Sequence, residues 1–353
     1  MEAGSRVRLM DVWVGVRDPL QARKVEHDLV EMLVVAVCAA LSGADGFVEI
    51  EVWAKEKRDW LRQYLKREHG IPCHDTFGRV FAAIDPEEFG AAFLRWVGQV
   101  VPMLSREEVV AIDGKTSRRS GKAGATPLHL VSAFAAEAGV VLGQRATAAK
   151  SNEKTAIPEL LTTLALEGGI VTIDAMGTQP NIAQAIRDRG ADYVLAVKDN
   201  QPTLAGSIRD FVSAFDAAPE RTPHRFHQVV EKDHGRLEVR RCHVFDQLDC
   251  LHAPERWPVL KSFAMITSER TIGGKTSVER RFYLSSLAPD AERMNRVVRQ
   301  HWRVENSLHW CMDVVFRDDQ ARTRTDHAAH NLAVLRQFVL NLLRTAPVKL
   351  RNH

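Results

Sequence analysis

Residues 109–122 read VVAIDGKTSRRSGK and decide the fold class. The apolar run Val109–Ile112 predicts a buried strand. Asp113 ends that run, and Gly114 is expected to break the strand. The loop that follows carries four cations and no acid: Lys115, Arg118, Arg119 and Lys122. Because an unpaired charge inside a buried strand costs several kcal/mol, Asp113 is expected at a strand end, facing a basic loop.

Composition indicates a globular protein of the cytoplasm. The chain has 353 residues, 45% of them hydrophobic, and a formal net charge of +3. Its cysteines are odd in number and scattered, which favours a reducing compartment over a disulfide scaffold: Cys38, Cys73, Cys242, Cys250 and Cys311. The longest apolar run, Met32–Leu41, is far shorter than the roughly 20 residues needed to cross a bilayer. The N-terminus shows no signal-peptide pattern.

A second acidic strand end follows the first. The stretch GIVTIDAMG, residues 169–177, is apolar up to Asp174. Between the two acids we predict a hairpin that turns at residues 137–139 and a helix with Pro158 at its first position. A short helix over 180–190 and a strand over 192–200 come next. This order predicts a mixed α/β sheet whose strand ends gather on one side.

The rest of the chain divides by pattern. Residues 24–104 show helical periodicity, with Asp75 or Thr76 as an expected N-cap. Residues 201–287 alternate as strands do. The chain then becomes helical again, with one long amphipathic helix expected over 291–316 and another over 327–346.

The two aspartates suggest a metal site. If their strands are neighbours, the carboxylates converge and repel, and a shared proton or a divalent cation would relieve them. Hard oxygen ligands without a thiolate indicate Mg²⁺ or Mn²⁺. Glu305 supplies a third acid on the later helix, where His301, Glu305 and His309 are spaced one turn apart.

Other readings of these residues stay open. A single aspartate after a strand is more often a turn or cap residue, and a helical glutamate is more often solvated. A zinc hydrolase could use His301, Glu305 and His309, although their spacing lacks the HExxH arrangement. A zinc site at Cys242, His243, Cys250 and His252 matches no common finger.

Together these motifs resemble those of bacterial insertion-sequence transposases of the DDE (RNase H-like) superfamily, in the H-repeat-associated group. The resemblance runs from about residue 18 to 343. It is carried by IPCHDTFGRVF, AIDGKTSR, SNEKTAIPELL, TIDAMGTQ, YVLAVKDNQ, HGRLEVR, YLSSL and HWRVENSLHWCMDVVFRDD, in that order.

The resemblance implies a catalytic triad of Asp113, Asp174 and Glu305 that binds two Mg²⁺ ions, with Mn²⁺ able to substitute. It implies cleavage and strand transfer of double-stranded DNA at element ends, by a homodimer or higher oligomer, associated with the nucleoid. The expected fold is an RNase H-like sheet flanked by helices. Its expected parts are a helical, possibly DNA-binding domain (1–105), the first part of the core (106–200), a β-rich insertion (201–287) and C-terminal core helices (288–353).

DNA contacts are expected from ten polar side chains, which would position phosphates without reading sequence: Lys115, Arg118, Arg119, Lys198, Asn200, Gln201, Arg236, Arg240, Arg299 and Arg303. One departure concerns a tyrosine–arginine–glutamate–lysine signature found in many relatives. At that spacing this chain has Val298, His301 and Met312 around Glu305, so a hairpin pathway relying on those groups is in doubt. His301 and His309 are candidate substitutes. A domesticated nuclease without strand transfer and a non-catalytic DNA-binding protein are the alternative functions.

Overall fold

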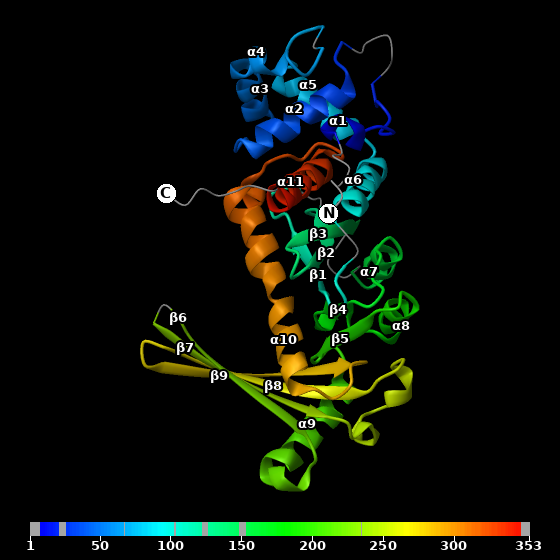
Figure 1. Cartoon of the computed structure of the whole chain (residues 1–353), viewed down its shortest axis with the longest axis vertical. Helices are drawn as coiled ribbons and strands as arrows, with labels where there is room; N and C mark the ends of the chain where they lie inside the picture. The colour runs from blue at the N-terminus through cyan, green and yellow to red at the C-terminus, as the bar shows by residue number, and fades with distance from the viewer. Residues whose placement is uncertain are drawn as a thin grey trace, which may run out of the picture.

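The computed structural model describes residues 8–20, 26–66, 68–101, 104–121, 126–147, 153–233 and 235–346. Lys122, His234 and the first two residues of SNEKTAIPELL lie outside these ranges. Within them, the first 100 residues form a helical module at one end of the molecule (Figure 1). Its helices are α1 (Leu9–Val12), α2 (Leu29–Leu41), α3 (Phe47–Glu56), α4 (Arg58–Leu61), α5 (His74–Ala83) and α6 (Pro86–Val100).

The rest of the described chain contains one nine-stranded sheet together with helices. Its strand order is β3-β2-β1-β4-β5-β9-β8-β7-β6. The pairs β1–β4 and β4–β5 are parallel, and all other neighbours are antiparallel. This mixed sheet flanked by helices confirms the RNase H-like class. The strands are β1 (Val109–Thr116), β2 (His129–Ala135), β3 (Val140–Thr147), β4 (Ile170–Ile173), β5 (Asp192–Val197), β6 (Arg225–Asp233), β7 (Arg236–Phe245), β8 (Ser262–Ile272) and β9 (Lys275–Ser285).

Helices cover both faces of the sheet. One face carries α10, which runs along β1, β4 and the β6–β8 strands, and the other carries α7 and α8 (Figure 1). The remaining helical elements are α7 (Glu153–Thr162), η3 (Ala175–Gly177), α8 (Pro180–Asp188), α9 (Pro202–Ala217), η4 (Pro219–Arg221), η5 (Leu248–Cys250), η6 (Pro254–Arg256), α10 (Ala291–His301), η7 (Val304–His309), η8 (Cys311–Val315), η9 (Asp318–Gln320) and α11 (Ala328–Thr345). None of the described helices is both long and apolar enough to span a bilayer.

The last helix joins the helical module to the sheet. α11 packs against α2, α5 and α6 on one side and β3 on the other. Phe338 lies at its centre, with ring centroids 4.9 Å from Trp13 and 4.3 Å from Trp96. Asn331 donates side-chain hydrogen bonds to the backbone carbonyls of Phe81 (2.8 Å) and Ile84 (2.9 Å). The two regions therefore share one apolar core.

The register of β1 and β4 confirms that the two acidic strands are neighbours. Ile112 pairs with Ile173 at the end of the parallel ladder, so Asp113 and Asp174 occupy the next positions. One expectation was wrong: Asp113 does not end its strand. β1 continues to Thr116 because its other edge stays paired with β2 through His129. Asp113 lies where β1 leaves β4, not where β1 ends.

Several element boundaries also differ from expectation. Pro158 lies inside α7 rather than at its start, because the helix already includes Glu153, whose carboxylate is held by His129 (2.6 Å). α5 begins at His74 without a side-chain cap from its own segment, since Glu51 of α3 accepts the His74 N–H (2.7 Å). The hairpin turn at 137–139 is confirmed, with Gly139 at φ +73°.

The helix over 291–316 was expected to be regular. It instead passes from α-helix in α10 to π-helical winding in η7 and η8. The region 201–287 begins with α9, which strand alternation did not predict, and α9 packs through Phe211 against Phe245 and Phe263. The four strands of this region extend the core sheet through β9 beside β5.

Candidate active site

Asp113 is a largely buried acid within a strand. Its Oδ1 accepts the backbone N–H of Gly114 (2.9 Å), and its side chain is only 18% exposed. Burial raises the pKa of this carboxyl to about 6; the charges of Glu305 and Asp174 act in the same direction and His309 opposes them. A carboxyl crowded by two others is stabilised by a cation.

Asp174 caps the turn that follows β4. Its Oδ1 accepts the backbone N–H groups of Met176 (2.9 Å) and Gly177 (3.4 Å) in η3. A Cβ at Gly177 would lie 2.8 Å from Ile157 Cδ1 and closer still to Ile173. Glycine is therefore needed for the turn that presents Asp174 beside β1.

The loop after β5 braces this turn. The Asn200 side chain donates to the carbonyl of Ala175, and Gln201 Nε2 donates to the carbonyl of Thr178 (3.0 Å). Thr178 Oγ1 in turn donates to the carbonyl of Ala196 (2.6 Å). Asn200 and Gln201, which were expected to contact DNA, thus make internal contacts behind Asp174.

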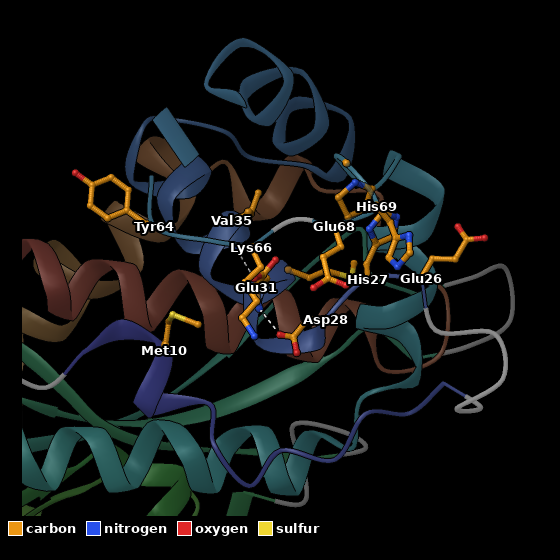
Figure 2. Close-up of a pocket in the computed structure, with 13 residues that line it drawn as sticks. Met10, Glu26, His27, Asp28, Glu31, Val35, Tyr64, Lys66, Glu68 and His69 are labelled. Atoms are coloured by element: carbon orange, nitrogen blue, oxygen red, sulfur yellow. Dashed lines mark hydrogen bonds between the residues drawn. The ribbon is translucent and has the colours of Figure 1, made fainter. Parts of the chain in front are cut away.

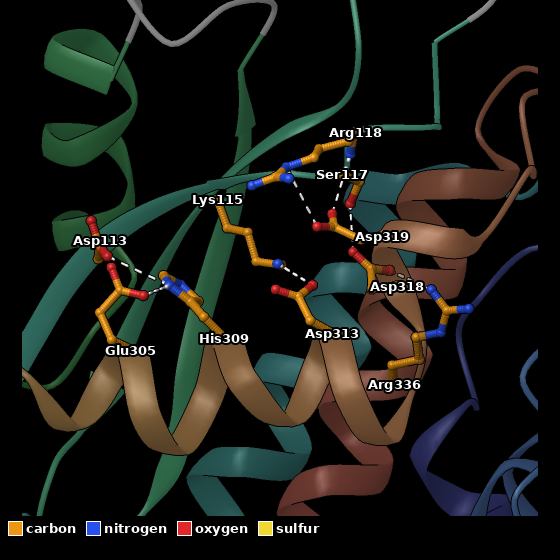
Figure 3. Close-up of polar contacts among 10 residues, drawn as sticks. All are labelled: Asp113, Lys115, Ser117, Arg118, Glu305, His309, Asp313, Asp318, Asp319 and Arg336. Carbon is orange, nitrogen blue, oxygen red and sulfur yellow. Dashed lines mark hydrogen bonds and ion pairs between the residues drawn. The ribbon is translucent and has the colours of Figure 1, made fainter.

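Glu305 reaches the site from the π-helical segment η7. Its Oε2 lies 3.2 Å from His309 Nδ1, and the same nitrogen lies 3.6 Å from Asp113 Oδ2 (Figure 3). The hydrogen bond from His309 lowers the pKa of Glu305. π-helical turns occur frequently at functional sites, and here one places the carboxylate and the imidazole together.

A metal-binding group can be tested on this geometry. One ligand atom each from Asp113, Glu305 and His309 lies within 4.8 Å of the others. Burial raises the pKa of Asp113, and the charges of Glu305 and Asp174 add to that rise. Two oxygen donors and one nitrogen donor fit a divalent cation. Asp174 is not among the three gathered residues; it follows Ile173, the register partner of Ile112, and so lies one position away.

His301 does not join this group. Its Nδ1 lies 2.9 Å from Thr172 Oγ1 of β4, and burial lowers its pKa to about 4. The zinc reading of His301, Glu305 and His309 is therefore wrong: among described residues, the ligand atoms that gather are those of Asp113, Glu305 and His309. The cysteine–histidine zinc reading is not met in the described chain either, and all five cysteines are free.

The basic loop after Asp113 faces a row of carboxylates. Lys115 Nζ forms an ion pair with Asp313. Ser117 Oγ donates to Asp318 Oδ2 (2.6 Å), and Arg118 Nε lies 3.5 Å from Asp319 Oδ2 (Figure 3). Further along, the Arg119 carbonyl accepts a hydrogen bond from Arg324 Nε (2.8 Å). The Arg118 side chain is 81% exposed, whereas that of Lys115 is only 17% exposed.

The other expected DNA contacts fall into two groups. Lys198 and Arg303 are exposed. Arg240 is buried between Glu238 (2.7 Å) and Glu231 (3.4 Å). The two remaining arginines pair with the same carboxylates: Arg236 lies 3.7 Å from Glu238, and Arg299 lies 3.5 Å from Glu231.

These arginines line a groove of about 360 Å³ between the β7–β9 strands and α10. Its wall includes Trp302, over which the Arg281 guanidinium stacks at 4.2 Å from the ring centroid, and Asn306, the residue after Glu305. The groove therefore reaches the segment that carries the third acid. Its excess of arginine suits a polyanion.

A larger pocket of about 520 Å³ lies in the helical module (Figure 2). Four carboxylates line it, those of Glu26, Asp28, Glu31 and Glu68. Such a lining repels phosphate, so this pocket does not supply the DNA contact considered for the module.

The mixed sheet, with Asp113 and Glu305 brought together and Asp174 at the neighbouring register position, is the arrangement expected of the DDE class of RNase H-like proteins. Residues 104–342 match the family described as "Transposase DDE domain", and residues 10–97 match "DDE_Tnp_1-associated". The chain therefore belongs to the DDE transposase family. No described helix or strand conflicts with that assignment.

Two curated proteins and one solved structure are similar to this chain. The chain is 38% identical to the "H repeat-associated putative transposase YhhI" of Escherichia coli K12, covering 95% of this chain and 90% of that protein. It is 42% identical to the "Uncharacterized protein in dhlA 3'region" of Xanthobacter autotrophicus, over 78% of this chain and 93% of that protein. A solved structure, "Cryo-EM structure of piggyBac transposase synaptic complex with hairpin DNA (SNHP)", has a TM-score of 0.42 at 9% identity, covering 95% and 70% of the two chains.

Sequence reasoning missed the supporting residues. The acids opposite the basic loop lie at the end of HWRVENSLHWCMDVVFRDD, a stretch read for Glu305 and the residues near it. Glu153, which His129 contacts, lies in SNEKTAIPELL, a stretch quoted only for the resemblance. Asp313 offered a signal, as an acid in the apolar stretch CMDVV, whereas Asp318 and Glu153 stand among polar residues.

Proposed function

We propose that this chain is an active DNA transposase whose site is built from Asp113, Asp174 and Glu305. The observation that carries the proposal is the meeting of Asp113 and Glu305, 192 positions apart in sequence, in one group of possible ligand atoms. Asp174 lies at the adjacent register position. We propose Mg²⁺ as the natural ion, with Mn²⁺ able to substitute, because carboxylate oxygens dominate the donor set.

The side chains divide the work. Asp113, Asp174 and Glu305 would together hold the two divalent ions. When bound, the ions activate the attacking hydroxyl and neutralise the charge on the leaving oxygen. His309 donates to Glu305 and orients it. His301, neutral because its pKa is low, supports β4 through Thr172 and is an accessory residue.

We propose double-stranded DNA as the substrate, both the element ends and the target. Exposed cations near the site, namely Arg118, Arg119, Lys198 and Arg303, would contact its phosphates. Arg236, Arg240 and Arg299 would act from the groove beside α10. Pairing two ends calls for a homodimer or higher oligomer.

The domain limits 1–105, 106–200, 201–287 and 288–353 remain predictions, as does DNA binding by the first. A nuclease without strand transfer would use the same triad. A non-catalytic DNA-binding protein would have no need for all three acids.

The test is cleavage of a labelled DNA carrying the gene's own flanking ends, with Mg²⁺, Mn²⁺ or EDTA. Wild type should nick the ends only with metal, and Asp174→Asn should abolish nicking while retaining DNA binding. Asp199→Asn is the matched control, because its carboxylate is 86% exposed and pairs with Arg209. Specific binding without cleavage by wild type in either metal would contradict the catalytic proposal.

A further inference from the structure

Contacts with three carboxylates fasten β1 to the segment that carries Glu305. All three carboxylates follow Glu305 in the chain, and all three partners follow Asp113, so the contacts run side by side (Figure 3). The described pairs are Lys115 with Asp313, Ser117 with Asp318, and Arg118 with Asp319.

Asp318 has the most enclosed position in this row, with 7% of its surface exposed. Its Oδ2 accepts the Ser117 hydroxyl (2.6 Å), and its Oδ1 forms an ion pair with Arg336 of α11. Arg336, 3% exposed, also donates to the carbonyl of Asp45 after α2 (2.8 Å). One carboxylate thus joins β1, α11 and, through Arg336, the helical module.

The backbone is shaped for this contact. Arg317 adopts the left-handed conformation, with φ +49°, which non-glycine residues rarely adopt without support from their surroundings. That turn ends the η7–η8 helical segment and directs Asp318 inward. The backbone conformation at Arg317 thus places the Asp318 carboxylate in the interior.

The two acids do not fix their own spacing. Asp113 and Glu305 are both negatively charged when ionised, and like charges this close repel each other. Glu305 is 51% exposed, and its carboxylate lies beside His309 and Asp113. Its position against β1 therefore depends on contacts made elsewhere in the segment.

We propose that Asp318 is a positioning residue that sets the spacing between Glu305 and Asp113. It does so by fastening η9, just after η8, to Arg336 of α11 and to Ser117, just after β1. Lys115 supports the same arrangement through Asp313 of η8 rather than contacting phosphate. The inference rests on the proposed function, in which Asp113 and Glu305 share divalent cations. Removing a residue that supports metal ligands typically lowers metal affinity on the order of 10–100-fold.

The decisive variant is Asp318→Asn. It keeps the shape and one acceptor oxygen but removes the negative charge that pairs with the buried Arg336 guanidinium. Asp319→Asn makes the same chemical change one residue later, where the partner Arg118 is 81% exposed. Asn341→Ala is a stability control, because it removes the buried Asn341–Val141 hydrogen bonds without touching the row.

Mn²⁺ binding by electron paramagnetic resonance gives a readout independent of cleavage. The site is defined as the Mn²⁺ bound by wild type and lost in Asp113→Asn. Asp318→Asn should weaken this binding by about tenfold or more, and Asp319→Asn and Asn341→Ala should stay within about twofold of wild type. A melting temperature that falls in Asp318→Asn while Mn²⁺ affinity of the folded protein stays unchanged would mean a purely structural role and overturn the proposal.

Hydrogen exchange without metal separates this inference from the proposed function. Amides of residues 304–316 should exchange faster in Asp318→Asn than in wild type or Asp319→Asn. If wild type neither binds Mn²⁺ at the site nor cuts DNA, the proposed function fails, and exchange alone decides the positioning role. Unchanged exchange over 304–316 would overturn it in that case.

Discussion

Gly114→Ala is the sharpest test of how β1 is built around Asp113. A Cβ at Gly114 would lie 2.6 Å from His129 Nε2, 2.9 Å from Glu153 Cδ and closer still to Glu153 Oε1. These side chains cannot swing away into solvent, because His129 is 2% exposed and Glu153 5% exposed. His129 is also held by Thr116 Oγ1 at 2.7 Å.

The cost follows from what must move. Overpacking a well-packed site costs about 1–3 kcal/mol, and leaving a buried hydrogen-bonding group without its partner adds about 1–3 kcal/mol. Because the methyl group meets the two polar ends of the pair rather than a flexible apolar chain, the expected loss is about 3–5 kcal/mol. At about 2 °C per kcal/mol for a chain of this size, Tm should fall by roughly 6–10 °C.

The assay is thermal and urea unfolding of the metal-free protein. Gly206→Ala in α9 is the matched control: its Cβ would meet nothing within 4 Å, so this change should be neutral or stabilising by about 0.5–1 kcal/mol. Adding Glu153→Ala to Gly114→Ala should show a coupling of at least about 1 kcal/mol. A Gly114→Ala protein as stable as Gly206→Ala would refute the reasoning.

Three further outcomes are expected. The pKa of Asp113, raised to about 6, means that the metal-free fold loses stability as pH rises through about 4 to 6. Asp113→Asn should therefore stabilise it by up to about 3 kcal/mol near pH 7.5 and not near pH 3.5, and equal Tm shifts at both would contradict this. Arg303→Gln should lower the salt dependence of DNA binding by about 0.9 in log–log slope, whereas Lys115→Gln, already neutralised by Asp313, should leave it unchanged. Asn200→Ala should slow cleavage by about tenfold at unchanged DNA affinity; a matching loss of affinity would instead indicate a DNA contact.

The central strands β1 and β4 could be predicted because the runs before Asp113 and Asp174 are buried. Those runs are almost wholly apolar, which is typical of central strands flanked by helices. Two acids that follow two such runs lie close together only if the two strands pair side by side and in register. The Ile112–Ile173 pair confirms this.

The remaining boundaries depend on contacts that local patterns do not contain. β1 runs past Asp113 because β2 still offers hydrogen bonds there, although the sequence turns polar. α7 starts before Pro158 because a histidine from another strand holds its first residue. The π-helical winding of η7 lets Glu305 and His309 face β1 together, and no single-residue preference encodes it.

Site residues could be predicted where a residue type is unusual for its position in the sequence, and could not where it is common there. An acid after a buried strand stands out, so Asp113 and Asp174 could be named. Asp318 looks like any helix-end acid in sequence, and only the fold shows it buried against Arg336. The same limit applies to Lys115, whose charge suggested DNA until its partner Asp313 was located.

The alternation of β1 explains the residue types of the opening motif. Asp113, Lys115 and Ser117 alternate onto one face, where they meet Glu305, His309 and the acids of the following segment (Figure 3). Gly114 and Thr116 alternate onto the other, against the buried His129–Glu153 contact. A shift of one residue would exchange these faces and place the Asp113 carboxylate against Glu153. The motif therefore specifies a strand register. Lys115 and Ser117, at the start of the basic loop expected to bind DNA, instead contact acids of the helical segment and help to keep this register fixed.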